Sequence, residues 1–269
     1  MRNALLLSSV VIVALVVLCA ACRDPRDSSP SAAPSAPVSA PVSPLDAGPP
    51  PLPPLAGVWL EPLGDGVGLV AIPLGAVARR PVVVSLHGAG GMAEWACGDW
   101  MGATEGYPFI VCPRTRAERK GQFASWTSVI EASERSQLAL ASARARYGAW
   151  MAEEEPVYVG FSQGGEMAVL AADKELMNWS ALFVHEGGYR QAKGALAHLL
   201  VGAKPVVATC STWGCGPLLP RAIGPHGKTV NYGPLGHSTG PVYLRLRADF
   251  ADMVRGREEW AGLPALRRH

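Results

Sequence analysis

The sequence is poor in the features that mark nucleic-acid-binding and metal-binding proteins. Its formal net charge is only +2, and charged residues make up 17% of its 269 residues, so no basic surface for a nucleic acid is indicated. The six histidines form no HxxxH pair, and no CxxC motif has a distant partner of the same kind. Both patterns are usual in metal sites. We therefore predict neither a nucleic-acid partner nor a metal site.

The N-terminus is almost free of charge. Residues 1–22 contain one basic residue, then the apolar run ALLLSSVVIVALVVL and then CAAC, a pattern typical of an export signal. The small residues before Cys22 resemble a bacterial lipoprotein signal, in which this cysteine is lipidated, although Cys19 stands where that signal usually has leucine. We predict such a signal over residues 1–22. An uncleaved anchor, or secretion with an unmodified Cys22, are the alternatives.

Residues 23–54 offer almost nothing to bury, because proline, serine and alanine dominate them. Such a segment cannot offset its ordering entropy, so we predict a disordered tether. Fully extended, it would reach roughly 100 Å. Behind a lipidated cysteine it would hold a folded domain, residues 55–269, away from a membrane. The expected location is the bacterial cell envelope, periplasmic or at the surface, with secretion as the alternative.

Four cysteines follow the predicted signal and tether. An even number in an exported domain permits two disulfides. Sequence proximity favours Cys97–Cys112 and Cys210–Cys215, although four cysteines allow three pairings. Four buried free thiols are the alternative.

The remaining chain contains short apolar runs without polar alternation. Such runs are typical of strands in a parallel sheet that is covered on both faces. Residues 129–153 and 165–178 lie between them and have helical spacing and strong helix formers. We therefore predict a single α/β domain with a mostly parallel sheet and helices on both faces. The expected strands span residues 81–88, 108–113, 156–162, 181–188 and 205–210.

A candidate nucleophile lies between an expected strand and an expected helix. The stretch GFSQG, residues 160–164, fits G-x-S-x-G. In that context the turn is sharp, and it raises the Oγ of Ser162 above the sheet. The N-terminal amides of the following helix would stabilise negative charge at the same place. Ser162 is therefore the predicted nucleophile.

Two other loops could complete the site. LHGAGG, residues 86–91, follows a strand, and such loops can supply an oxyanion donor. The backbone N–H groups of Ala89 and Gln163 would then face the oxyanion, whereas the alternative is a plain turn. His237, in a Gly- and Pro-rich loop before the final helix, is the expected general base. His226 is the rival, and an exposed histidine without a role is the alternative for either.

The motifs LHGAGG, GFSQGGEMA and GHS, in this order, resemble the α/β-hydrolase superfamily. The form GFSQGG is similar to its carboxylesterase/phospholipase-like branch. This resemblance implies Ser162 as nucleophile, His237 as base, and Ala89 and Gln163 as oxyanion donors. It also implies hydrolysis of an ester, thioester or related acyl bond, without a cofactor.

The resemblance implies an acid too, usually an aspartate after the next-to-last strand. Here that stretch, TCSTWGCGPLLPRAIGPHGK, contains neither Asp nor Glu. Glu186 directly follows an expected strand, and some members of the superfamily draw their acid from that position. We hypothesise a Ser162–His237–Glu186 triad. In the alternative, Glu186 binds substrate or caps a turn, and a hydroxyl or carbonyl orients His237. The other carboxylates between serine and histidine are Glu166, Asp173 and Glu175.

Two tryptophans are candidate substrate-binding residues. Trp95 follows the LHGAGG loop, and Trp213 lies inside the possible Cys210–Cys215 loop. Trp100 and Trp126 are instead expected to cover the core, as tryptophans more often do. The sequence as a whole predicts a membrane-tethered serine esterase with an open site for small or surface-bound esters. The alternatives are a serine peptidase or amidase on the same fold, and a non-catalytic envelope-binding protein with a degenerate triad.

Overall fold

The structure is a computed structural model that describes residues 52–213 and 215–267. The predicted signal, with Cys19 and Cys22, and most of the predicted tether lie outside the described residues. The end of the tether is described, and it contacts the folded domain. The Leu52 N–H donates to Val77 O at 3.2 Å, and the Trp150 indole N–H donates to Pro53 O at 3.1 Å.

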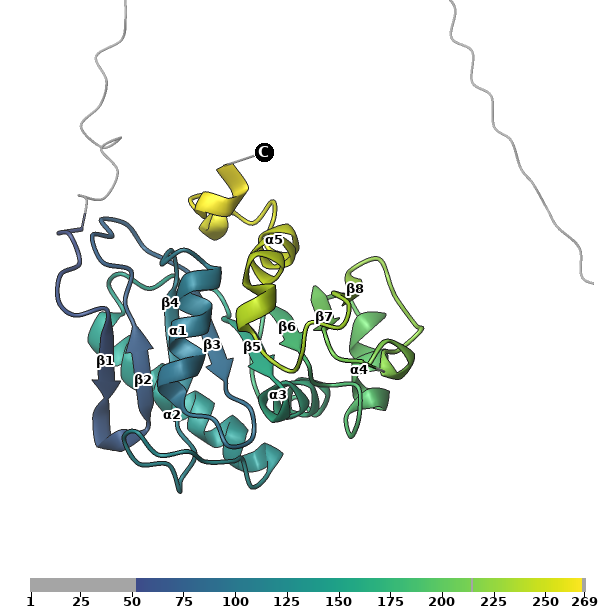
Figure 1. Ribbon diagram of the computed structural model, residues 1–269. Coiled ribbons are helices and arrows are strands. Elements are labelled where there is room, and N and C mark those ends of the chain that lie inside the picture. The colour runs from purple at the N-terminus through teal and green to yellow at the C-terminus, as the bar shows by residue number, and fades with distance from the viewer. Residues whose placement is uncertain (1–51, 214, 268–269) are drawn as a thin grey trace, which may run out of the picture. The chain divides into compact units, whose positions relative to one another are not determined.

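An eight-stranded sheet forms the centre of the domain (Figure 1), in the order β1-β2-β4-β3-β5-β6-β7-β8. The β1–β2 and β2–β4 pairs are antiparallel, and every later pair is parallel. The strands are β1 (Leu60–Leu63), β2 (Gly68–Ala71), β3 (Val82–Leu86), β4 (Phe109–Pro113), β5 (Val157–Phe161), β6 (Ala181–His185), β7 (Val206–Cys210) and β8 (Gly227–Asn231).

The five predicted strands are β3 to β7. Nearly all their residues are buried, because helices cover both faces of the sheet. The sequence did not predict β1, β2 or β8. Two of these, β1 (LEPL) and β8 (GKTVN), are the edges of the sheet, where proline and lysine are tolerated.

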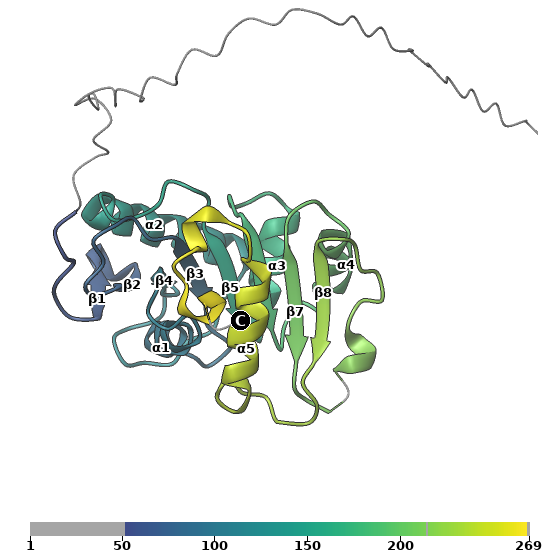
Figure 2. The same ribbon diagram turned by 90° about the horizontal axis from the view of Figure 1, so that it is seen from above.

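Helices form a layer on each side of the sheet (Figure 2). On one face α1 (Ala93–Ala103) packs beside α5 (Tyr243–Met253). On the other face α2 (Val129–Tyr147), α3 (Gln163–Asp173) and α4 (Lys193–Leu200) lie side by side. The sequence did not predict α1 or α4. The predicted helix over 129–153 is too long, because α2 ends before Gly148, a poor helix former, and Met151 then bridges to Arg80.

Both disulfides join the pairs that sequence proximity favours. Cys97 of α1 is bonded to Cys112 of β4, and Cys210, the last residue of β7, is bonded to Cys215. Across residues 52–213 and 215–267, no helix is long and apolar enough to cross a membrane.

Candidate active site

Ser162 lies on a strained turn between β5 and α3. Its backbone has φ 51° and ψ −119°, a region that residues with a side chain rarely adopt. Close packing explains the flanking glycines: a Cβ on Gly160 would lie 2.6 Å from Gly164 O, and one on Gly164 would lie 2.5 Å from His87 O. The turn therefore holds Ser162 against the loop after β3, half-buried at the C-terminal edge of the sheet.

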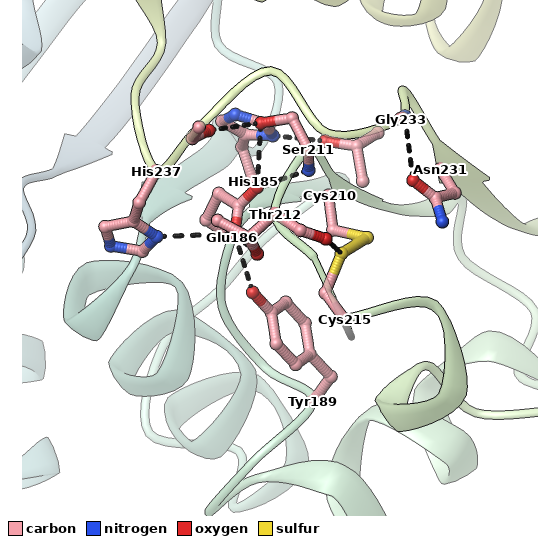
Figure 3. Close-up of a disulfide and its surroundings, with 12 residues drawn as sticks. His185, Glu186, Tyr189, Cys210, Ser211, Thr212, Cys215, Asn231, Gly233 and His237 are labelled. Carbon is pink, nitrogen blue, oxygen red and sulfur yellow. Dashed lines mark hydrogen bonds and ion pairs between the residues drawn. A yellow bond between two sulfur atoms is a disulfide. The ribbon is translucent and has the colours of Figure 1, made fainter.

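Three of the sequence-predicted residues come together at this edge. His237 Nε2 lies 2.9 Å from Ser162 Oγ, and His237 Nδ1 lies 3.3 Å from Glu186 Oε2. Figure 3 shows the ring of His237 pointing at the Glu186 carboxylate. An imidazole in this position can accept the hydroxyl proton, and the carboxylate can stabilise the imidazolium that results. The rival histidine, His226, is exposed and directly precedes β8, at the opposite end of the sheet.

Glu186 is a buried carboxylate surrounded by donors. Its Oε1 accepts hydrogen bonds from the backbone N–H and the hydroxyl of Ser211. Its Oε2 accepts from the hydroxyls of Thr212 at 2.7 Å and Tyr189 at 2.8 Å. Burial raises the pKa of Glu186, but the bonds from Thr212, Ser211 and Tyr189 outweigh burial and lower the pKa to about 2. The carboxylate is therefore ionised at any ordinary pH.

The backbone of Glu186, like that of Ser162, has a positive φ. Its φ is 57°, on the left-handed side that favours glycine. Strained residues gather at functional sites more often than elsewhere. Two residues of the candidate triad therefore carry the backbone signature of such sites.

The other three carboxylates between serine and histidine have different partners. Glu166 accepts the backbone N–H groups of Arg190 and Ala192, and so it fixes the loop after β6. Asp173 bonds to His198, and Glu175 is exposed after α3. None of the three hydrogen-bonds to His237.

The two predicted oxyanion donors lie on either side of the nucleophile in the chain. Ala89 is in the loop after β3, and Gln163 is the first residue of α3. Within the described residues neither backbone N–H has an acceptor, so both are free to bind an oxyanion. The loop that carries Ala89 is held by bonds from Gly91 N to Gly88 O and from Gly90 N to Ser125 Oγ, each 3.0 Å long.

A buried network beneath these donors was not predicted from the sequence. The Trp126 indole N–H donates to His87 O at 3.0 Å, and its ring stacks on the His87 ring with centroids 4.9 Å apart. His87 Nε2 faces Glu118 Oε2 at 3.1 Å, and both side chains are buried. Glu118 Oε1 accepts the N–H of Ala93. No local motif around Glu118 indicates this pairing, because the two residues are far apart in sequence.

A second unpredicted residue, His185, lies at the end of β6. Its Nδ1 is 2.9 Å from Thr209 Oγ1, and its Nε2 is 3.3 Å from Ser238 O. Burial lowers the pKa of His185 and so favours its neutral form. Because a carbonyl oxygen only accepts, Nε2–H is the donor to Ser238 O. His185 thereby holds the residue that follows His237.

Two hollows share His237 in their lining. The first, about 250 Å³, is mostly apolar and lies between the LHGAGG loop and α1. The second, about 350 Å³, includes Ser162, Arg190 and Trp213 in its lining. Trp95 lines the first hollow, and Trp213 is 87% exposed at the second. The predicted substrate-binding tryptophans thus lie in different hollows, whereas Trp100 and Trp126 are buried.

Comparison with known proteins gives structural likeness only. No protein-family profile matches the chain, and no curated protein sequence matches it. An uncharacterised protein from Bacillus cereus superposes with a TM-score of 0.52 at 11% identity, over 66% of this chain and 60% of its own. A Bacillus cereus carboxylesterase superposes with a TM-score of 0.43 at 13% identity, over 65% of this chain and 89% of its own. A monoacylglycerol lipase from Paleococcus ferrophilus superposes with a TM-score of 0.43 at 12% identity, over 63% of this chain and 96% of its own.

The sheet topology and the turn at Ser162 define the fold class. A mostly parallel sheet with an antiparallel β2, layered by helices, carries a serine on a strained turn from strand to helix. This is the α/β-hydrolase fold, as the sequence predicts. Within the described residues no cluster of His, Cys, Asp and Glu is suited to a metal ion.

Proposed function

We propose that this protein is a serine hydrolase that cleaves a carboxylic ester or thioester through an acyl-enzyme. One observation carries the proposal: His237 Nε2 lies 2.9 Å from Ser162 Oγ, while its Nδ1 faces the ionised carboxylate of Glu186. A serine within reach of a base that is itself oriented by an acid is the arrangement required for nucleophilic acyl transfer.

In this proposal Ser162 Oγ attacks the carbonyl carbon while His237 Nε2 takes its proton. The electron pair of the C=O bond moves to the oxygen, and the N–H groups of Ala89 and Gln163 bind that oxyanion. One such donor typically contributes about 3 kcal/mol to transition-state stabilisation. When the tetrahedral intermediate collapses, the alcohol or thiol leaves with the proton from His237. Water then attacks the acyl-serine by the same route and releases the acid.

Glu186 has an orienting and electrostatic role in this mechanism. As an ionised acceptor it keeps the proton of neutral His237 on Nδ1, which leaves Nε2 free to act as the base. It also stabilises the imidazolium after proton transfer, and it does not itself take the proton. Its position after β6 replaces the acid that the superfamily usually has after the next-to-last strand.

The size and the openness of the hollows favour substrates with small acyl groups, or esters presented at a surface. Pockets for drug-sized ligands usually measure about 300–1,000 Å³, so the first hollow, about 250 Å³, has room for a small apolar group. The His237 side chain is 50% exposed. A substrate can therefore reach the histidine without displacing a covering segment.

A fluorophosphonate probe tests the proposal. It should label the wild-type chain and fail to label Ser162→Ala, and aryl or acyl esters should be hydrolysed faster than peptides. A folded wild-type protein that is not labelled would overturn the enzyme proposal and favour a binding protein. Faster cleavage of peptides would instead identify a peptidase or amidase.

We also infer that the protein is exported and tethered to the cell envelope through a lipid on Cys22. The two disulfides support an oxidising location. The test is metabolic labelling with a labelled fatty acid in a bacterial host that expresses the full chain. The wild type and the control Cys19→Ala should incorporate the label, and Cys22→Ala should not. An unlabelled wild type, or labelling that survives Cys22→Ala, would contradict the lipid anchor.

A further inference from the structure

We propose that the Cys210–Cys215 disulfide is a positioning device for the acid of the triad: it fixes the loop whose donors hold Glu186 against His237. This inference rests on the proposed function in assigning the acid role to Glu186. It adds that the disulfide acts on the reaction through that carboxylate. Figure 3 shows the disulfide, the loop and the carboxylate together.

The first end of the loop is fixed by the sheet. Cys210 is the last residue of β7, and its carbonyl accepts the N–H of Tyr232 at 2.7 Å. The preceding residue, Thr209, accepts the N–H of Glu186 at 2.9 Å. The backbone of Glu186 and the start of the loop are therefore adjacent because β6 and β7 are neighbouring parallel strands.

The next two residues supply most of the donors to the carboxylate. Ser211 donates its backbone N–H and its hydroxyl to Oε1, and Thr212 donates its hydroxyl to Oε2. Together with Tyr189 they outweigh the effect of burial and keep Glu186 ionised. A carboxylate buried without such donors has a raised pKa and becomes protonated more easily.

Ser211 also holds the segment that carries the histidine. Its carbonyl accepts the N–H of Leu235 at 2.7 Å and of Gly236 at 3.0 Å. Its hydroxyl lies 2.8 Å from both Gly236 O and Glu186 Oε1. The residue directly after Cys210 therefore contacts both the acid and the chain leading to His237.

The second end of the loop depends on the disulfide. Ser211 is fully buried, but the chain leaves the core after it: Thr212 is half-buried and Trp213 is 87% exposed, so packing contributes little to holding Thr212 and Trp213. The bond closes the loop five residues after Cys210, and the two Cα atoms are 6.3 Å apart. Cys215 is 2% exposed. The disulfide thus returns the chain to the core immediately after the donors of Ser211 and Thr212.

The second disulfide of the chain provides a matched control. Cys97–Cys112 joins α1 to β4 and is equally buried. Within the described residues, no neighbour of Cys97 or Cys112 in the chain bonds to Glu186 or His237, whereas Ser211, next to Cys210, bonds to Glu186. We expect Cys210→Ala/Cys215→Ala to lower kcat roughly 10- to 100-fold, as small misplacements of catalytic groups do, with KM changed less than about twofold. Cys97→Ala/Cys112→Ala should leave kcat within about twofold of wild type.

A double-mutant cycle tests whether the disulfide acts through the carboxylate. In a Glu186→Gln background, removal of Cys210–Cys215 should cause no further fall in kcat, because residues that act as a unit are strongly non-additive. An equal fall in kcat in the wild-type and Glu186→Gln backgrounds would overturn the proposal, because the disulfide would then act through the stability of the whole domain and not through Glu186. Unchanged kcat in the wild-type background would overturn it as well.

A measurement without turnover separates this inference from the proposed function. A carboxyl ¹³C NMR titration should show the pKa of Glu186 rising in Cys210→Ala/Cys215→Ala and unchanged in the control pair. If the pKa of Glu186 does not rise in Cys210→Ala/Cys215→Ala, or rises equally in the control pair, the positioning role is overturned, whether or not the protein hydrolyses esters. If the double variant does not fold, Cys215→Ala alone, which keeps the buried Cys210 side chain, is titrated in the same way. A wild-type protein that fails to hydrolyse any ester would overturn the proposed function alone.

Discussion

The side-chain amide of Gln163 pairs with both backbone polar groups of Trp126. Its Oε1 accepts the Trp126 N–H and its Nε2 donates to Trp126 O, each at 2.9 Å. Trp126 in turn donates to His87 O and stacks on the His87 ring. The loop with Ala89 directly follows His87, so the two proposed oxyanion donors share one support.

The first prediction concerns this pairing. Gln163→Ala keeps the backbone N–H but removes both bonds to Trp126, so we expect kcat for ester hydrolysis to fall roughly tenfold with little change in KM. The control is Gln137→Ala, which also loses an amide bond to a carbonyl, that of Leu176 at 2.7 Å, but on α2, away from the site. Equal effects of the two substitutions would contradict a specific role for the Gln163 side chain.

The second prediction concerns the acid. Glu186→Gln keeps the shape of the side chain but removes its charge, so the imidazolium of His237 loses its stabilising partner. Replacing the acid of a triad by its amide can lower turnover by about 10⁴, and we expect a fall approaching that size in steady-state ester hydrolysis. Glu175→Gln, at an exposed position after α3, serves as control. Unchanged turnover in Glu186→Gln would eliminate its role in the triad.

The third prediction follows from the pKa of the same carboxylate. Folding lowers it from the ordinary value of 4.5 to about 2, so ionised Glu186 stabilises the folded state above pH 4.5. That contribution is lost as the pH falls from 4.5 toward 2. Between pH 6 and pH 3 the free energy of unfolding of the wild type should fall by up to about 2 kcal/mol more than that of Glu186→Gln, which lacks this carboxylate. Denaturant unfolding of both proteins at pH 6 and pH 3 measures this difference, and parallel pH dependences would contradict it.

The strands of the sheet centre could be predicted because their sequences are mostly apolar, without polar residues at alternate positions. VVVSL of β3 and ALFVH of β6 are buried on both faces, and such runs have few other interpretations. In contrast, the four-residue β1 contains proline, and α1 distributes its apolar and small residues around the whole helix. Neither segment shows the spacing of apolar residues that is typical of a strand or a helix. Both elements therefore depend on contacts with the rest of the fold, which a single sequence does not show.

The same distinction applies to the site. Ser162 lies in a local motif, and Glu186 is indicated because it directly follows an expected strand while the stretch after the next-to-last strand has no carboxylate. The hydroxyls of Ser211 and Thr212 reach Glu186 because β6 and β7 are aligned so that His185 is opposite Thr209. Register between strands is a property of the assembled sheet, and a single sequence does not state it. A signal was present nevertheless: two hydroxyl residues occupy the position where the superfamily usually has its acid.

The final prediction concerns the backbone strain at Ser162. At φ 51° and ψ −119° a side chain is strained, typically by about 1–3 kcal/mol, whereas glycine adopts this conformation freely. Both Ser162→Gly and Ser162→Ala remove the hydroxyl, but the alanine variant keeps the strain. We therefore expect Ser162→Gly to be more stable than Ser162→Ala by about 1 kcal/mol, after allowing for the greater entropy of glycine in the unfolded chain.

Denaturant unfolding of the two inactive variants measures the strain without interference from activity. Ala141→Gly, at an exposed position within α2, calibrates the usual cost of glycine, and it should destabilise the protein by about 1 kcal/mol. Opposite signs at the two positions would show that the turn holds Ser162 against a backbone preference. If Ser162→Gly were less stable than Ser162→Ala by the same amount as in the helix, the turn would carry no strain. Its glycines would then be explained by close packing alone.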